Sequence, residues 1–205
     1  MEEKTMKKLI TLVLAMVLAL SLAACGSGDE TPSKTESTNG GGNSTGSTGK
    51  WVLVNTETAK VGETDYVKFS GEKGNYENLS TTDNQGSGKA TATISEPPSE
   101  IKPGDEISFQ INGNYTGDFP FNWEYSANLG FTENYFAIED SEQGYSSYRV
   151  KFGVGDDLKS SNSETVKLKA IKAGETGKTV EIRTGLSASG DGISTKYTYE
   201  WQAGN

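Results

Sequence analysis

Histidine is absent from this 205-residue chain, and Cys25 is its single cysteine. One cysteine cannot close a disulfide within the chain, and metal sites built from histidine and cysteine lack a set of ligands. Nucleophilic catalysis by a Ser–His or Cys–His pair is excluded for the same reason. These absences remove most routes to metal and nucleophilic chemistry, and the sequence predicts no cofactor.

Apolar runs long enough to cross a membrane are also lacking. The longest run, Leu9–Ala24, has 16 residues, whereas a membrane-spanning helix needs roughly 20. It follows Lys7 and Lys8 and ends in small residues, which is the layout of a secretory signal peptide. Acidic residues precede Met6, and because they weaken a basic leader, Met6 is a second candidate start.

The end of this apolar run carries a short motif, Leu22-Ala23-Ala24-Cys25. It resembles the lipobox of bacterial lipoproteins. The resemblance implies cleavage before Cys25, a diacylglyceryl thioether on its sulfur with fatty acids such as palmitate, and attachment to the extracytoplasmic face of the cell membrane. Two acyl chains on one residue are enough for stable anchoring. The alternative is an ordinary secretory signal with a cysteine near the cut.

The segment after the motif, residues 26–50, contains no large apolar residue and consists mainly of Gly, Ser, Thr and Asn. Such a segment cannot bury enough surface to offset its ordering entropy, so we expect a flexible tether. All 19 aromatic residues lie in 51–205. The expected organisation is a signal peptide at 1–24, a lipidated cysteine and linker at 25–50, and one folded domain at 51–205.

The charge balance is acidic, with a net charge of −9. This excess argues against nucleic acid as a partner and against a polybasic surface that would bind anionic lipid. We therefore expect contact with the membrane only through the lipid on Cys25, and a cell-envelope glycan or protein as the possible partner.

Side-chain alternation in 51–205 has a period of two residues, the pattern of half-buried strands. Residues 106–112 show it clearly, because Ile107, Phe109 and Ile111 alternate with polar residues. No window of twelve residues supports an amphipathic helix. The pattern predicts strands at 106–112, 121–126, 148–154, 166–170 and 197–201, and weaker candidates at 51–60, 65–70, 90–95, 134–139 and 179–184.

Turn signals separate these strands, among them Pro103-Gly104-Asp105 and Ser189-Gly190-Asp191-Gly192. Many short strands with glycine-rich turns predict an all-β sandwich or barrel, and the polar face of each strand favours a single antiparallel β-sandwich, immunoglobulin-like or jelly-roll. Residues 96–111 (EPPSEIKPGDEISFQI) resemble the approach to a strand in bacterial immunoglobulin-like sandwiches. Two tandem subdomains of about 75 residues are the alternative.

Aromatic residues are the first candidates for a ligand site, because sugar rings pack well on flat amphipathic side chains. Several of them share one face of a predicted strand, so the competing interpretation is that they form the core. The tyrosines in or near expected loops, Tyr115, Tyr145 and Tyr135, are better candidates for exposed ligand contacts than the strand tryptophans. The candidate contacts are Tyr115, Trp123, Tyr125, Tyr145, Tyr199 and Trp201.

Carboxylates are the second group of candidates. Glu139, Asp140 and Glu142 cluster after a weak strand, and further acidic residues lie in turns, but no calcium-loop pattern occurs. A glycosidase needs two carboxylates roughly 5–10 Å apart, for which Glu124 and Glu200, beside tryptophans, are the natural nominees. Sequence alone assigns neither a metal site nor a catalytic residue.

Three functions remain open after these exclusions. The favoured one is a lipid-anchored cell-surface protein with a non-catalytic module that binds a glycan, a cell-wall polymer or a protein. The second is a small glycoside hydrolase or lyase that uses a carboxylate pair. The third is a structural or assembly accessory of the envelope, for example one that pairs through a sheet edge.

Overall fold

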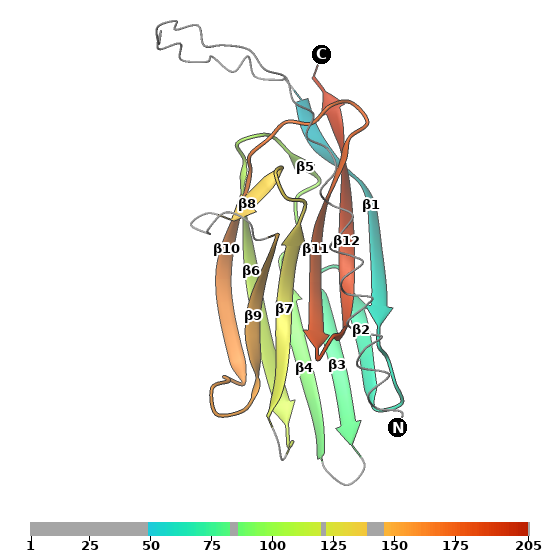
Figure 1. The fold of residues 1–205 in the computed structure, drawn as a ribbon, viewed down its shortest axis with the longest axis vertical. Helices are drawn as coiled ribbons and strands as arrows, with labels where there is room; N and C mark the ends of the chain where they lie inside the picture. Colours follow the sequence, from blue (N-terminus) through green and yellow to red (C-terminus); the bar gives the residue numbers. More distant parts are fainter. Residues whose placement is uncertain (1–48, 83–85, 120–121, 139–145, 205) are drawn as a thin grey trace, which may run out of the picture. The chain divides into compact units, whose positions relative to one another are not determined.

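The computed structural model describes residues 49–82, 86–119, 122–138 and 146–204, which form twelve β-strands (Figure 1). Cys25, the signal segment and the linker up to residue 48 lie outside the described residues, and so do Tyr145 and the cluster Glu139–Glu142. The strands are β1 (Gly49–Val61), β2 (Val67–Glu72), β3 (Asn75–Thr82), β4 (Gly86–Ile94), β5 (Glu100–Ile101), β6 (Glu106–Gly117), β7 (Trp123–Phe131), β8 (Phe136–Ile138), β9 (Ser147–Val154), β10 (Ser161–Ala170), β11 (Thr179–Ala188) and β12 (Asp191–Ala203).

These strands form two six-stranded antiparallel sheets that pack face to face as a single β-sandwich. Sheet A has the order β5-β1-β12-β11-β7-β9, and sheet B has the order β2-β3-β4-β6-β10-β8. The first long strand, β1, pairs with the last, β12. The two halves of the chain are therefore interleaved, and the alternative of two tandem subdomains is wrong.

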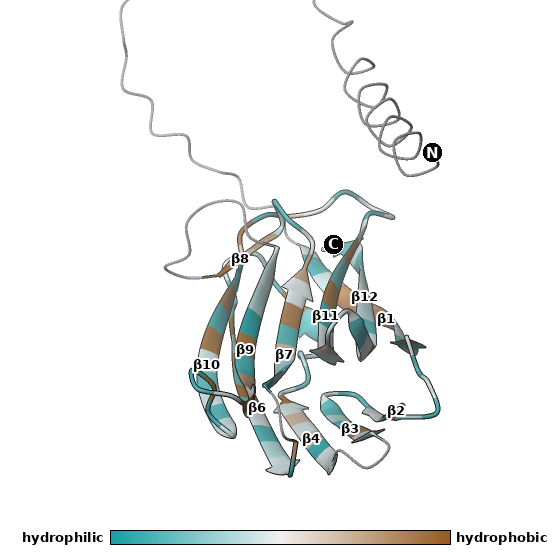
Figure 2. Ribbon diagram, turned by 60° about the horizontal axis from the view of Figure 1, so that its bottom comes forward, coloured by the Kyte–Doolittle hydropathy of each residue, from teal (hydrophilic) through white to brown (hydrophobic). Residues whose placement is uncertain are grey.

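The strands predicted from alternation are all present, most of them longer than the sequence suggested. Apolar residues at every second position of β6 point inward, while the residues between them face solvent. Figure 2 shows the resulting bands of hydrophilic and hydrophobic residues along β9 and β10. Gly49 and Lys50, which the sequence placed in the linker, are the first residues of β1 and pair with the end of β12.

Strands β3 and β5 were not predicted. On β3 the buried positions are Tyr76, Asn78 and Ser80, while Leu79 faces solvent with 47% exposure. Polarity along β3 is thus nearly the reverse of the usual pattern. The inward polar groups bond to one another: Ser80 Oγ donates to Asn78 Oδ1 (2.5 Å), and the Tyr125 hydroxyl donates to Ser80 Oγ (3.3 Å). Burying these side chains is tolerable because they are hydrogen-bonded.

One turn sets the register on which the later site depends. Ser189 and Gly190 join β11 to β12, and both have positive φ, 50° and 94°. A two-residue hairpin with two positive φ values is a type I′ turn, whose twist matches that of the flanking strands. It pairs Ala188 with Asp191 and Leu186 with Ile193. The turn signal seen in the sequence is confirmed here.

The described sheet edges are only partly covered. β5 and β8, which each end a sheet, have two and three residues, and they pair only with Trp51–Val52 of β1 and Leu168–Ala170 of β10. Among the described residues, the rest of β1 and of β10 has no strand partner on its outer side. The edge strand β2 is bonded at one point, where the Phe69 N–H donates to Glu63 Oε1 (2.8 Å), and the edge strand β9 where the Gly153 N–H donates to the Lys159 carbonyl (2.9 Å). Open stretches of edge can pair with another chain.

No helix long and apolar enough to cross a bilayer occurs in the part of the chain that the structure describes.

The packing predicts a large difference in stability between an inward and an outward residue. Phe109 is fully buried between the sheets, whereas Leu79 is half exposed. We expect Phe109→Ala to lower the free energy of unfolding by about 3–5 kcal/mol through lost burial and a cavity, and Leu79→Ala to lower it by less than about 1 kcal/mol. Chemical denaturation measures both, and similar losses would contradict the assignment of faces.

Candidate functional site

The strand aromatics that were candidate ligand contacts lie in the core. Tyr125 and Tyr199 are fully buried, Trp201 is 2% exposed, and Trp123 is partly buried against the core. Tyr115 was expected near a loop, but it lies in β6 with 5% exposure. The expectation of an exposed Tyr115 is therefore wrong, because its position in the alternation of β6 turns it inward.

These aromatic side chains gather at the two ends of the sandwich. At one end a stack runs through Trp123, Phe119, Tyr115, Tyr125 and Phe152, with ring centroids 5.1–6.3 Å apart. At the other end Trp51 and Trp201 are direct cross-strand partners with centroids 5.0 Å apart. Their rings pack against the protein, so neither cluster offers an open platform for a sugar.

Tyr135 also has its ring face occupied by the chain. The Lys172 and Lys178 ammonium groups lie 5.2 and 5.6 Å from its ring centroid, and its ring is perpendicular to that of Trp51, with centroids 5.4 Å apart. The cations are attracted by the negative face of the ring. Tyr135 therefore acts here as a closing element of the core.

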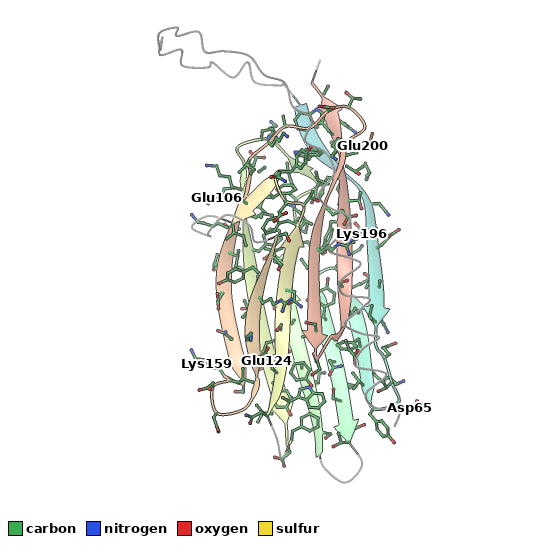
Figure 3. All side chains as sticks on the ribbon, viewed as in Figure 1. Asp65, Glu106, Glu124, Lys159, Lys196 and Glu200 are labelled. Carbon is green, nitrogen blue, oxygen red and sulfur yellow. The ribbon has the colours of Figure 1, made fainter. Side chains whose placement is uncertain are left out.

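The nominated carboxylates do not form a pair with each other. Glu124 is at the start of β7, whereas Glu200 is near the end of β12, and Figure 3 shows them at opposite ends of the sandwich. Through the register with β11 they are offset by about ten residues, or roughly 33 Å along the strand direction. This is far beyond the roughly 5–10 Å of a glycosidase pair. Glu124 instead pairs with Lys151, at 3.1 Å.

Acidic turns give no metal cluster within the described residues, where no group of three or more carboxylate, His or Cys ligands comes together. Asp156 and Asp157 lie in the loop between β9 and β10, and Asp191 begins β12. Glu139, Asp140 and Glu142 lie outside the described residues.

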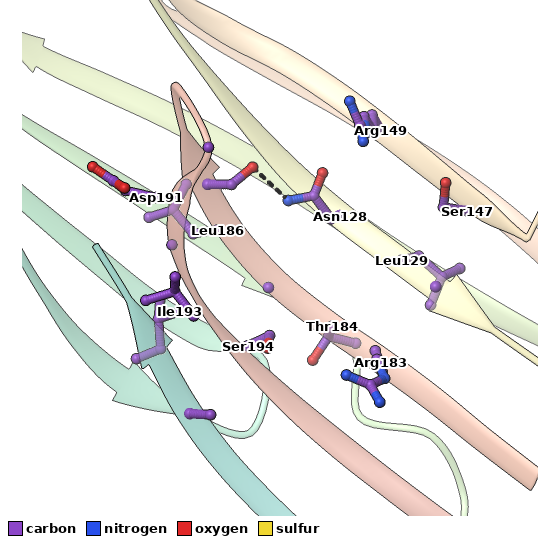
Figure 4. A pocket seen from close by; sticks show the side chains of 17 residues that line it. Asn128, Leu129, Ser147, Arg149, Arg183, Thr184, Leu186, Asp191, Ile193 and Ser194 are labelled. Atoms are coloured by element: carbon purple, nitrogen blue, oxygen red, sulfur yellow. Dashed lines mark hydrogen bonds between the residues drawn. The ribbon is translucent and has the colours of Figure 1, made fainter. Parts of the chain in front are cut away.

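The feature that the sequence did not reveal is a groove on the solvent-facing side of sheet A, which we call the sheet A groove (Figure 4). Its volume is about 360 Å³, at the small end of the range for ligand pockets. It runs across five adjacent strands, and the cross-strand partners along it are Arg149 on β9, Asn128 on β7, Gly185 on β11, Ser194 on β12 and Ala59 on β1.

Glycines make this part of the sheet hollow. A Cβ on Gly185 would lie 2.6 Å from the Ile193 carbonyl oxygen, and one on Gly192 would lie 2.7 Å from the Leu186 carbonyl oxygen. Both glycines are required by the close approach of β11 and β12. Gly130 differs, because a Cβ there would meet its nearest neighbours only at 3.7 Å. Gly130 therefore has room for a Cβ in ordinary van der Waals contact, and packing does not require glycine there.

Polar groups line the floor and one end of the groove. The Asn128 amide donates to Ser187 Oγ (2.9 Å) and to the Ser126 carbonyl (3.0 Å), while its buried Oδ1 has no hydrogen-bond partner. Arg149 and Arg183 stand on either side of β7 (Figure 4). The two guanidinium groups, as charged donors, make this end suitable for a negatively charged ligand.

The sequence contains one signal for this site besides its alternation, namely the rarity of arginine. Arg149 and Arg183 are the only arginines in the chain, among 17 lysines. Both occupy outward positions of strands, but nothing in the sequence shows that they share a face, because β9 and β11 are brought together only through β7.

Two core tyrosines show strongly perturbed acidity. Burial is the main cause that raises the pKa of Tyr199 and Tyr197 above the ordinary value of 10.0. The Tyr199 hydroxyl donates to the Pro98 carbonyl (2.7 Å). Tyr197 has no hydrogen bond of normal geometry, since the neighbouring Thr184 hydroxyl is bonded to Tyr76 instead, at 2.6 Å. Neither tyrosine reaches the groove, so their role is in packing.

The raised pKa values of these two tyrosines predict that the folded protein loses stability at alkaline pH. Because the folded-state pKa of both lies above the unfolded value, the unfolded chain ionises first, so their contribution is full below about pH 10 and declines as the pH rises above it. In a titration of phenolate absorbance, we expect some tyrosines to ionise only as circular dichroism is lost. We expect Tyr197→Phe to raise the alkaline midpoint and to change neutral-pH stability by less than about 1 kcal/mol. Ionisation of all nine tyrosines with the fold intact would contradict this.

Comparison with known proteins identifies no relative. No family model, no curated protein and no solved structure matches the chain. The function therefore has to be argued from the sheet A groove and from the residues around it.

Proposed function

We propose that this chain is a lipid-anchored protein of the bacterial cell surface whose β-sandwich is a non-catalytic binding module. The proposed ligand is a glycan, a cell-wall polymer or a protein of the envelope. The observation that carries the binding role is the sheet A groove, a hollow of about 360 Å³ that opens on the outer face of a sheet. The anchoring role rests on the Leu22–Cys25 motif and on the polar linker that follows it.

The shape and chemistry of the domain support binding more than catalysis. Chemistry at a reacting atom needs titratable groups held within hydrogen-bond reach of one another. The titratable side chains that line the groove are Arg149, Arg183 and Asp191. Arginine stays charged and is a poor proton-transfer group, while Asp191 lies at the end of the groove away from Arg149 (Figure 4). The groove thus supplies recognition without an acid–base pair.

The sheet A groove favours a sheet face as the binding surface. The parts of β1 and β10 that the short strands β5 and β8 leave uncovered present edges that an assembly accessory would use, so that function stays a second candidate. A rigid sheet face with an open hollow supports recognition of a ligand that crosses the strands.

Lipid anchoring is tested at Cys25. We expect the Cys25→Ala variant to incorporate no labelled fatty acid and to leave the membrane fraction, because the thioether has no sulfur to form on. Ser27→Ala, two residues along, serves as the matched control and should keep both label and location. Labelling that persists in Cys25→Ala would refute the anchor.

Binding by the groove is tested with a bulky substitution at its open glycine. The purified full chain is presented to a glycan array and to isolated envelope fractions. We expect specific retention of at least one component, and at least about tenfold weaker retention by Gly130→Trp, because a bulky side chain at this lining position takes up groove volume while its Cβ makes only ordinary contacts. Ser108→Trp, on the exposed outer face of sheet B, is the matched control and should bind normally. No retention of any component, or equal retention by Gly130→Trp and the parent chain, would contradict the proposed binding by the groove.

A further inference from the structure

The sheet A groove contains both arginines of the chain, and this points to the chemistry of its ligand. Arginine is not interchangeable with lysine, because its planar guanidinium presents parallel N–H donors that match the two oxygens of a carboxylate or phosphate. Elsewhere the chain uses lysine for positive charge, at 17 positions. Both arginines, with their forked N–H donors, line the same groove.

The register places the two arginines within reach of a common ligand. Arg149 is opposite Asn128, and Arg183 is opposite Gly130, so they flank β7 on a diagonal. Strand spacing and rise put their Cα atoms roughly 12 Å apart. Gly130 lies between them and carries no side chain, and a Cβ there would be 3.7 Å from Arg183 Cβ. Gly130 and both arginines line the same groove, so a ligand over Gly130 lies beside both arginine-bearing strands.

The charges at the groove leave one excess positive charge at this end. Arg183 is held by Glu181, whose Oε2 accepts from Nη2 (2.7 Å) and Nε (3.1 Å). Arg149 is solvent-exposed and forms no ion pair with another of the residues that the structure describes. Asp191 lies at the opposite end of the groove (Figure 4). One bound oxyanion neutralises the excess positive charge of Arg149.

We propose that the sheet A groove binds an acidic glycan through one oxyanion, a carboxylate or a phosphodiester, bound by Arg149 and oriented by Arg183. This inference rests on the proposed binding function and names its ligand class. Ser147, Ser187 and Ser194 line the groove and offer hydroxyl groups to sugar hydroxyls. No aromatic ring is among the residues that line it, so stacking, the usual anchor for a neutral sugar, is absent and charge takes its place.

The rest of the surface sets a limit on how acidic the ligand is. The chain carries a net charge of −9, which repels a dense polyanion approaching from solution. The net negative charge of the chain repels each acidic group of a ligand, and one arginine offsets this repulsion for one group. We therefore expect a glycan whose acidic groups are far apart. A strongly charged acidic peptide gains the same guanidinium contact but meets this repulsion at every other residue.

The test measures binding of small acidic glycans to the purified full chain by calorimetry. One arm uses a uronic acid disaccharide with its methyl ester as the neutral match, and the other uses a sugar phosphodiester with its neutral parent sugar. We expect one acidic compound to bind at least about tenfold more tightly than its neutral match, and the arm that binds identifies the oxyanion. A poly-glutamate peptide is expected to bind more weakly than that compound.

Variants locate the effect at the groove. We expect Arg149→Gln to weaken acidic-glycan binding at least about tenfold and Arg149→Lys to restore only part of it, since lysine keeps the charge but loses the fork. Lys89→Gln, on the outer face of sheet B, removes one charge far from the groove and should have no effect. Unchanged unfolding midpoints show that the variants are folded.

The outcomes separate this inference from the binding function on which it rests. Neutral and acidic compounds that bind equally, with Arg149→Gln unaffected but Gly130→Trp inactive, would overturn the acidic ligand and leave a binding groove in place. Tighter binding of poly-glutamate than of either acidic sugar would replace a glycan with a peptide and likewise overturn the inference. If no ligand binds and Gly130→Trp gives the same result as the parent chain, both the acidic-glycan inference and the proposed binding function are contradicted.

Discussion

Aromatic packing between the two sheets is the interaction on which the rest of the structure depends. A single cysteine cannot cross-link the chain, so the sandwich is held by what its strands bury. Trp51 and Trp201 close one end, while the stack that includes Tyr115 and Tyr125 fills the other. Each large ring removes roughly 150–250 Å² from water. Because these side chains are committed to the core, they are not available to a ligand, and recognition is left to the outer faces.

The outer face of sheet A acquires its shape from backbone constraints rather than from large side chains. The Ser189-Gly190 turn sets the register of β11 and β12, and that register brings Gly185 and Gly192 against neighbouring carbonyls. The glycines at these positions have no side chains and so form the floor of the sheet A groove, which Gly130 on the adjacent strand extends. A binding surface built in this way is rigid, since it belongs to the central strands of a sheet, and rigid surfaces lose little entropy on binding.

Much of the fold was accessible from sequence because its physical cause is local. Alternation at β6 and β12 marked inward residues correctly, and the glycine turns were read from their chemistry. β3 escaped because Asn78 and Ser80 face inward while Leu79 faces solvent, an arrangement stabilised by partners on other elements, including Tyr125 from sheet A. Tyr115 was misplaced because β6 continues past residue 112, where polar residues obscure its alternation.

The amino-acid sequence by itself determined most of the strands, their turns and most inward faces, because these follow from side-chain period and backbone preference within a few residues. It also determined which chemistries are absent, since no fold supplies histidine. Only the tertiary structure decided which outward residues share a surface. Arg149 and Arg183 are far apart in sequence and meet at one groove because β7 pairs with both β9 and β11. Strand order and register arise from long-range packing of the whole sandwich, so the groove exists only once both sheets have formed.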